Sequence, residues 1–242
     1  KWGIPYLIGT KVINPSFVMG RYETEVKDAV ARAIRHGVPE SFIEKTEGYT
    51  GAVAIIETDR PGPVTAFRCD MDALPVRESD DPSHLPAKEG FASERPGVMH
   101  ACGHDAHTAV GLTVAHWIWD HKDEFCGTFK ILFQPAEEGV RGGRPMAESG
   151  ILDDVDWLAG SHVGGDFHSG EVSVQKAGFL ASTKFDISFT GLEAHAGGNP
   201  ERGRNALVAA ACATMMIQGI PRHSAGDSRV AVGKLVAGEG RN

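Results

Sequence analysis

Hydrophobic residues recur with helical spacing in three stretches of the chain. Residues 23–36 place their apolar positions on one stripe, and Gly37 follows directly, so this stretch predicts an amphipathic helix that packs by that stripe. Residues 105–120 predict a second helix, and the alanine-rich residues 205–217 predict a third. In the second stretch the apolar stripe consists of Val110, Val114, Trp117 and Ile118.

Short apolar runs between these stretches predict strands. Residues 51–57 and 63–68 are two such runs, joined by a turn rich in proline and glycine. Residues 127–133 predict another strand, and residues 155–161 predict a buried one. A short helix is expected at 144–149, and the polar residues 80–96 are expected to form a surface loop. This alternation predicts an α/β fold with a mixed, mostly parallel sheet flanked by helices.

The pattern changes near residue 182. Residues 184–190 alternate between polar and apolar side chains, as a half-exposed antiparallel strand does, and residues 230–236 return to a strand pattern. Together with the helix at 205–217, these runs predict a second, smaller α+β unit. We therefore expect two domains, over residues 1–181 and residues 182–242.

Polar side chains that can carry chemistry follow several of the predicted strands. Asp70 and Asp72 come after one strand, Glu137 and Glu138 after another, and His162 after a third. In open α/β sheets, sites form beyond the carboxyl ends of the strands. Each residue alone has an ordinary structural explanation, such as a turn cap or a solvated charge. Their shared placement instead indicates one site.

The segment from Met99 to Thr108 contains three histidines, a cysteine and an aspartate just before a predicted helix. On an extended segment, Cys102 and His104 would point to one side, and thiolate and imidazole suit a borderline metal such as zinc. The alternative is a helix start capped by Asp105, with Cys102 as a small buried apolar residue. The density of the cluster favours the metal site.

Adjacent glutamates after a strand can divide two tasks. If the segment is extended, Glu137 and Glu138 face opposite ways, so that one coordinates a metal while the other takes a proton from water. This pairing is what metal-assisted hydrolysis requires. Cys102, His104, Glu138 and His162 would make four protein ligands. They could form a closed structural site or be shared between two ions, and the residues alone leave both arrangements open.

Composition narrows the class of protein. The chain has 242 residues, of which 41% are hydrophobic, and its formal net charge of −8 argues against nucleic acid or an anionic membrane as a partner. The four cysteines are scattered, as in proteins of a reducing compartment, so we expect a cytoplasmic protein. From the pattern of charged and apolar residues we expect neither a signal peptide nor a membrane-spanning segment.

Five segments, in this order, resemble the superfamily of dinuclear metallo-amidohydrolases that includes aminoacylases, carboxypeptidases and auxin-conjugate hydrolases. They are FRCDMDALPV, MHACGHDAHT, FQPAEEG, SHVG and GLEAHAG. Further segments, among them DPSHLPAKEGFAS and GRPMAESGILDDVDW, are similar to the aminobenzoyl-glutamate hydrolase branch. The likeness covers almost the whole chain and is weakest over residues 1–50.

The resemblance implies a role for each matching residue. Glu137 matches the general base, and Asp72 matches an acidic residue that orients the metal ligands. His195 matches a lid histidine that reaches the site of a partner subunit, so a homodimer or a heteromer with a related subunit is implied. Asn242 resembles the start of a lid motif that binds the substrate carboxylate. The implied ligands of two divalent ions, Mn²⁺ or Zn²⁺, are Cys102, His104, Glu138 and His162.

The resemblance also implies the reaction. The expected substrate is an amide between an aroyl or acyl group and an amino acid, with p-aminobenzoyl-glutamate as the first candidate. The alternatives are an N-acyl or auxin-type amidohydrolase and a truncated, non-catalytic metal-binding subunit. The resemblance implies that residues 1–181 are the N-terminal part of a catalytic metal-binding domain and residues 182–242 part of a lid or dimerisation domain. The family continues beyond position 242 and supplies a last histidine ligand there, so we expect both domains to be incomplete. An acidic substrate would need a cationic pocket, which Arg141, Arg144, Arg202 or Arg204 could supply.

Overall fold

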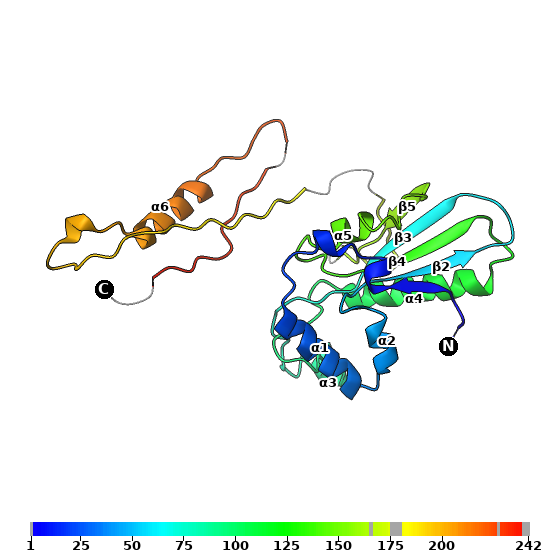
Figure 1. Ribbon diagram of the computed structural model, residues 1–242. Coiled ribbons are helices and arrows are strands. Elements are labelled where there is room, and N and C mark those ends of the chain that lie inside the picture. Colours follow the sequence, from blue (N-terminus) through cyan, green and yellow to red (C-terminus); the bar gives the residue numbers. More distant parts are fainter. Residues whose placement is uncertain (1, 165–166, 175–180, 227, 239–242) are drawn as a thin grey trace. The chain divides into compact units, whose positions relative to one another are not determined.

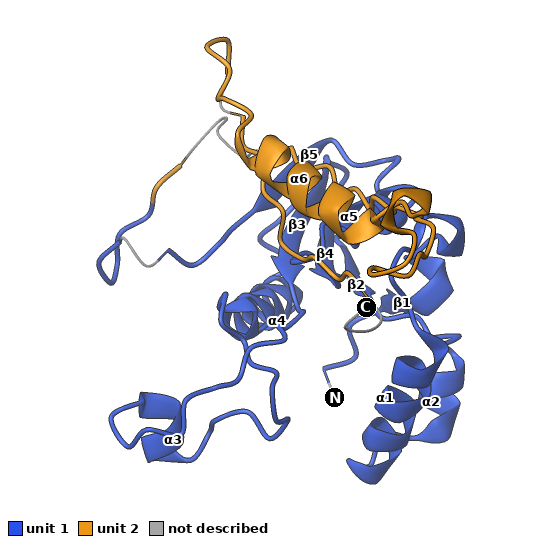
Figure 2. Ribbon diagram, turned by 90° about the vertical axis from the view of Figure 1, so that its left-hand side faces the viewer, with its two compact units in different colours: residues 1–172 blue, residues 173–242 orange. Residues whose placement is uncertain are grey.

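The computed structural model describes residues 2–164, 167–174, 181–226 and 228–238. The chain divides into two compact units, residues 1–172 and 173–242 (Figure 2). The boundary expected between 181 and 182 lies beside residues 175–180, which are outside the described residues. Among the described residues, no helix is both long enough and apolar enough to cross a membrane.

The first unit contains a mixed sheet of five strands in the order β1-β2-β4-β3-β5 (Figure 1). β2 pairs antiparallel with β1 and with β4, whereas β3 runs parallel to both β4 and β5. The strands are β1 (Tyr6–Ile8), β2 (Ala52–Glu57), β3 (Val64–Asp70), β4 (Thr128–Gln134) and β5 (Trp157–Gly160). This mixed sheet flanked by helices confirms the predicted α/β fold. β1 lies in a region where the sequence predicts no element.

The predicted helices at 23–36, 105–120, 144–149 and 205–217 are confirmed, with shifts of a few residues at their ends. The helices are α1 (Glu23–Arg35), α2 (Glu40–Glu44), α3 (Leu85–Glu89), α4 (His104–Asp120), α5 (Gly143–Ala147) and α6 (Ala206–Gln218). Short 3₁₀ turns occupy Gly9–Lys11, Pro15–Phe17 and Pro200–Arg202. The prediction of a loop at 80–96 is wrong for α3, because a proline in its first turn and the left-handed Gly90 at its end favour one helical turn there.

Two hydrophobic layers cover opposite faces of the sheet. Because side chains alternate along a strand, Leu132 packs on one face while Ile131 and Phe133 pack on the other. The face of Ile131 and Phe133 is covered by α4, as Figure 1 shows, and the face of Leu132 is covered by Met146 of α5 and by residues near the N-terminus. The helix that begins with the histidine cluster is therefore held directly on the sheet.

The buried stripe of α4 differs from the predicted one. Val110 and Trp117 are exposed, and the buried residues are His104, His107, Gly111, Ala115 and Ile118. The small residues bring the helix close to the sheet: a Cβ at Gly111 would lie 2.2 Å from Sγ of Cys69. The sequence pattern follows large apolar side chains, whereas close packing here selects small ones. As a result, His104 and His107 face the sheet.

Two other strand predictions fail. The run at 155–161 does contain β5, which lies at the edge of the sheet beside β3, but every residue of this strand is exposed. The runs at 184–190 and 230–236 form no strand among the described residues of the second unit, which contains α6 and an isolated bridge between Leu192 and Arg204. Alternation alone does not make a strand, because its backbone groups need a neighbouring strand to bond.

Candidate metal centre

Three parallel strands end at the same edge of the sheet. β3, β4 and β5 run in one direction, so the segments that follow Asp70, Gln134 and Gly160 leave the sheet at one edge. The connection from β3 to β4 passes through α4, which runs back across the sheet and must therefore begin at that edge. This topology explains why residues far apart in the sequence meet in one place.

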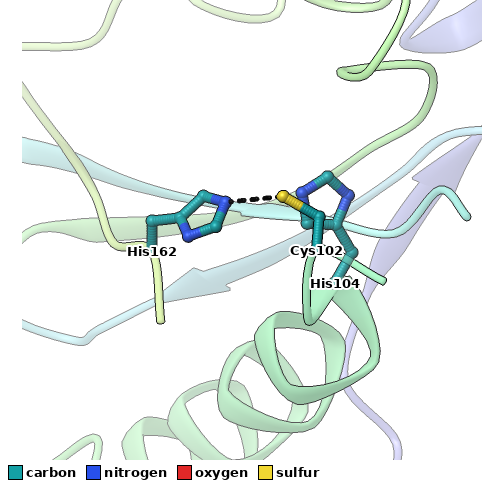
Figure 3. A group of neighbouring side chains, drawn as sticks. All are labelled: Cys102, His104 and His162. Atoms are coloured by element: carbon teal, nitrogen blue, oxygen red, sulfur yellow. Dashed lines mark hydrogen bonds between the residues drawn. The ribbon is translucent and has the colours of Figure 1, made fainter. Parts of the chain in front are cut away.

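Cys102, His104 and His162 form the centre of this cluster (Figure 3). Their ligand atoms all lie within 4.8 Å of one another, and Sγ of Cys102 is 3.4 Å from Nε2 of His162. As expected, the cluster lies where a loop becomes a helix, but the loop is a turn and not an extended segment: Gly103 adopts a left-handed conformation with φ of 78° and is the N-cap of α4. The turn nevertheless places the thiol and both imidazoles side by side.

The ring of His104 is held from one side and open on the other. Nδ1 lies 3.0 Å from the backbone oxygen of Asp72 and 3.1 Å from its Oδ1. Because Nδ1 contacts acceptors, it carries the proton, and Nε2 keeps its lone pair. Nε2 is fully buried and makes no hydrogen bond. A buried lone pair without a partner is costly, and a bound cation would satisfy it.

Glu137 and Glu138 face the same imidazole. Glu137 Oε2 lies 3.8 Å and Glu138 Oε1 3.9 Å from His104 Nε2. The expectation of opposite directions is wrong, because residues 137–140 form a turn and not an extended segment. Ala136 and Val140, on either side of the glutamates, have φ of 54° and 53°, which is rare for residues with a Cβ.

The donor set fits a divalent metal ion. Burial, a hydrogen bond with Glu138 and the neighbouring carboxylates raise the pKa of the Cys102 thiol to about 11. At neutral pH this thiol keeps its proton unless a cation compensates the negative charge, and metal binding would release the proton. Thiolate and imidazole groups around one open buried nitrogen suit an ion such as Zn²⁺, and the carboxylates also suit a harder ion such as Mn²⁺.

His107 is a buried member of the cluster for which the sequence predicts no role. It is 2% exposed, and its pKa is lowered by burial and by the neighbouring His162 and His104. The available signal is its position three residues after His104, which places both rings on one face of a helix.

The remaining predicted residues lie elsewhere. His195 belongs to the second unit, where its Nδ1 accepts the N–H of Gly197, and its role stays a prediction. Asn242 lies outside the described residues. Of the arginines proposed for an acidic substrate, Arg144 pairs with Glu148 and lies over the ring of Phe17. Arg141 directly follows the turn that carries the glutamates, and its backbone N–H donates to the carbonyl of Ala136.

A family profile, curated sequences and a solved structure all match this chain. The profile of Peptidase family M20/M25/M40 matches residues 66–230. Indole-3-acetyl-aspartic acid hydrolase of Enterobacter agglomerans is 51% identical over 242 residues, 99% of this chain. One of the subunits of p-aminobenzoyl-glutamate hydrolase from Escherichia coli strain K12 is 48% identical over 242 residues, again 99% of this chain. The crystal structure of an aminobenzoyl-glutamate utilization protein from Klebsiella pneumoniae aligns with a TM-score of 0.71 at 36% identity and covers 100% of this chain.

The chain is shorter than these proteins. It spans 56% of the length of each of the two curated relatives and 55% of the solved structure. The part matched by the family profile contains most of β3, all of β4 and β5, and all of the clustered side chains.

Proposed function

Since this chain belongs to peptidase family M20/M25/M40, we propose that it carries the metal centre of an amidohydrolase that cleaves the bond between an acyl or aroyl group and an amino acid. The resemblance seen in the sequence motifs is thereby confirmed at the level of the family. The activity, substrate and partners of the whole protein are inferences from its relatives and from the site.

One observation carries the proposal. Nε2 of His104 is buried without a hydrogen bond at a point that the Cys102 thiol, the His162 imidazole and two carboxylates surround. A purely structural cluster would satisfy this nitrogen with a donor from the protein. Cys102, His104, Glu138 and His162 are the residues we propose to hold the ions, and Asp72 orients His104. Two divalent ions, Mn²⁺ or Zn²⁺, are proposed from the family resemblance.

A divalent cation held here would supply Lewis acidity, which polarises the scissile carbonyl and makes water easier to deprotonate. Glu137 is proposed as the general base, because its carboxylate lies beside the cluster and its side chain is 36% exposed, so water can reach it. It would accept a proton from the attacking water and pass it to the leaving nitrogen of the amide. His195 is proposed to stabilise the developing negative charge on the carbonyl oxygen, as the resemblance implies.

The names of two relatives suggest the substrate class. One names a p-aminobenzoyl group joined to glutamate, and the other names an indole-3-acetyl group joined to aspartic acid. Both are aromatic acyl groups on an acidic amino acid. We therefore propose p-aminobenzoyl-glutamate as the first substrate and indole-3-acetyl-aspartate as the second candidate.

Assembly and location follow the same reasoning. Because the relative from Escherichia coli is named as one subunit of its hydrolase, we propose that the protein works as a homodimer or together with a related chain. The four cysteines are free, which is consistent with our proposal of a cytoplasmic protein.

Metal analysis combined with hydrolysis tests the proposal. The full-length protein should bind Mn²⁺ or Zn²⁺ and, once loaded, should release glutamate from p-aminobenzoyl-glutamate or aspartate from indole-3-acetyl-aspartate. The ratio of kcat/KM for the two substrates decides between them. Bound metal without hydrolysis of either would favour the non-catalytic alternative, and a protein that binds no metal would contradict the assignment.

A further inference from the structure

His107 connects α4 to the segment that carries His162. Its Nε2 accepts the backbone N–H of Val163 at 3.0 Å, and Val163 directly follows His162. That segment leaves β5, an exposed edge strand of four residues, so few contacts from its own strand hold it. The hydrogen bond to His107 therefore ties this backbone to α4, which packs directly on the sheet.

Asp70 faces the other nitrogen of the same ring. Because Nε2 accepts a hydrogen bond, the neutral ring carries its proton on Nδ1, which lies 3.6 Å from Oδ2 of Asp70. Asp70 is itself held, because Arg68 donates to its Oδ1 and the hydroxyl of Thr108 donates to its backbone oxygen. At this distance Nδ1 makes no hydrogen bond, but the negative charge of the fixed carboxylate favours the tautomer with its proton on Nδ1, which leaves Nε2 free to accept.

Close packing supports the same arrangement. The ring of His107 stands edge-on to that of His162, with centroids 4.4 Å apart and an angle of 83° between the planes. A Cβ on Gly103 would lie 2.5 Å from Cγ2 of Val163, so the segment also lies close against the start of α4. The orientation of His162 thus depends on contacts made by residues that we do not assign as metal ligands.

We propose that Asp70 and His107 form a buried positioning pair that holds the 162–163 backbone and so aims the His162 imidazole at Cys102 and His104. The inference rests on the proposed metal centre and adds to it a reason why the site is formed before the ion arrives. His107 acts through Val163 and does not itself coordinate the ion. Substitution of either Asp70 or His107 should therefore weaken the affinity for the metal ion without reducing the number of ions bound.

The test is titration of the metal-free, full-length protein with Co²⁺. Binding is monitored through the absorption band of the cysteine-bound cobalt. His107→Phe keeps a ring of similar size but has no acceptor, and it should weaken Co²⁺ binding by about 10- to 100-fold and shift the band. His107→Gln offers an amide oxygen near the position of Nε2 and should bind more tightly than His107→Phe. His116→Gln is the matched control, because His116 lies on the same helix with a side chain that is 39% exposed.

Asp70→Asn gives a second route if His107→Phe does not fold, as judged by circular dichroism. An amide in place of the carboxylate no longer favours the His107 tautomer with its proton on Nδ1, so the affinity for Co²⁺ should fall, as in His107→Phe. Parent-like affinity and spectrum in folded His107→Phe or Asp70→Asn would overturn the positioning role alone. Loss of one whole equivalent of Co²⁺ in His107→Gln would also overturn it, because His107 would then be a ligand. A parent protein that binds no Co²⁺ would overturn the proposed function as well.

Discussion

Asp72 connects His104 to Glu138. Its Oδ1 lies 3.1 Å from Nδ1 of His104, and its Oδ2 accepts the backbone N–H of Glu138 at 3.0 Å. One carboxylate therefore holds two parts of the site: the imidazole of His104 at the start of α4, and the turn after β4 that carries Glu138.

The first prediction concerns this double contact. In Asp72→Asn the amide supplies one acceptor oxygen in place of two, so the side chain loses its contact with either His104 or Glu138, although His104 keeps the backbone oxygen of residue 72. We expect the dissociation constant for Mn²⁺ or Zn²⁺, measured by calorimetry, to rise about 10- to 100-fold. Asp105→Asn is the control, because Asp105 is an exposed carboxylate beside His104. Equal effects of the two substitutions would contradict the role of Asp72.

Substitutions of Glu137 and Glu138 should have different effects on metal content and activity. Glu137→Gln should keep its metal and lower kcat by about 10²- to 10⁴-fold, because an amide cannot accept the proton from water. Glu138→Ala should lose metal and activity together, because a ligand is removed. Metal content by mass spectrometry and hydrolysis of p-aminobenzoyl-glutamate are measured on both. The proposed mechanism is wrong if Glu137→Gln is nearly as active as the parent.

Gly111→Ala tests the close approach of α4 to the sheet. The added Cβ would lie 2.2 Å from Sγ of Cys69 and 3.0 Å from Cε1 of Phe133. Alanine favours a helix by about 1 kcal/mol over glycine, but overpacking costs about 1–3 kcal/mol, so we expect a net loss of stability in urea unfolding. Thr113→Ala, on the exposed face, should change stability by less than about 0.5 kcal/mol. A more stable Gly111→Ala protein would show that the helix can move away at no cost.

Asp154→Asn tests a pH dependence. The hydrogen bond from Lys130 holds the pKa of Asp154 below its ordinary value of 3.8. A lowered pKa means that the pair stabilises the fold above about pH 4 and that this contribution disappears as pH falls through the lowered pKa.

In the variant, Lys130, which is 6% exposed, loses its charged partner and keeps two neutral acceptors, the carbonyl of Ile151 and the amide oxygen of the new side chain. Because the Asp154 side chain is 60% exposed, solvent screens the pair, and stability at pH 7 should fall by no more than about 1 kcal/mol. The loss of stability on acidification below pH ~4 should become shallower. Urea unfolding at several pH values measures both effects. Asp153→Asn is the neighbouring control, and an unchanged acid profile in Asp154→Asn would refute the prediction.

His195 is expected to act on the site of a partner subunit. It lies in the second compact unit, whereas the clustered ligands all lie in the first. Mixing full-length His195→Ala with full-length Glu137→Ala, each inactive alone, should restore part of the activity through hybrid dimers. No recovery, despite subunit exchange shown by native mass spectrometry, would count against action in trans.

Much of the site could be predicted from the sequence, because strand ends are local features. The apolar runs before Asp70, Glu137 and His162 predict strands, and the rule that sites form at carboxyl ends predicts their meeting. The motifs around Cys102 and Glu137 were also enough to identify the family. These inferences need only the order of residues along the chain.

Tertiary structure decided how those residues face one another. The sequence pattern of α4 favours Val110 and Trp117 as its buried face, but the close approach allowed by Gly111 and Ala115 turns His104 and His107 toward the sheet. The glutamates were expected to diverge, yet their turn directs both at His104. Which side of a helix is buried and how a turn bends depend on the space left by distant residues, and a sequence pattern describes only each segment's own periodicity.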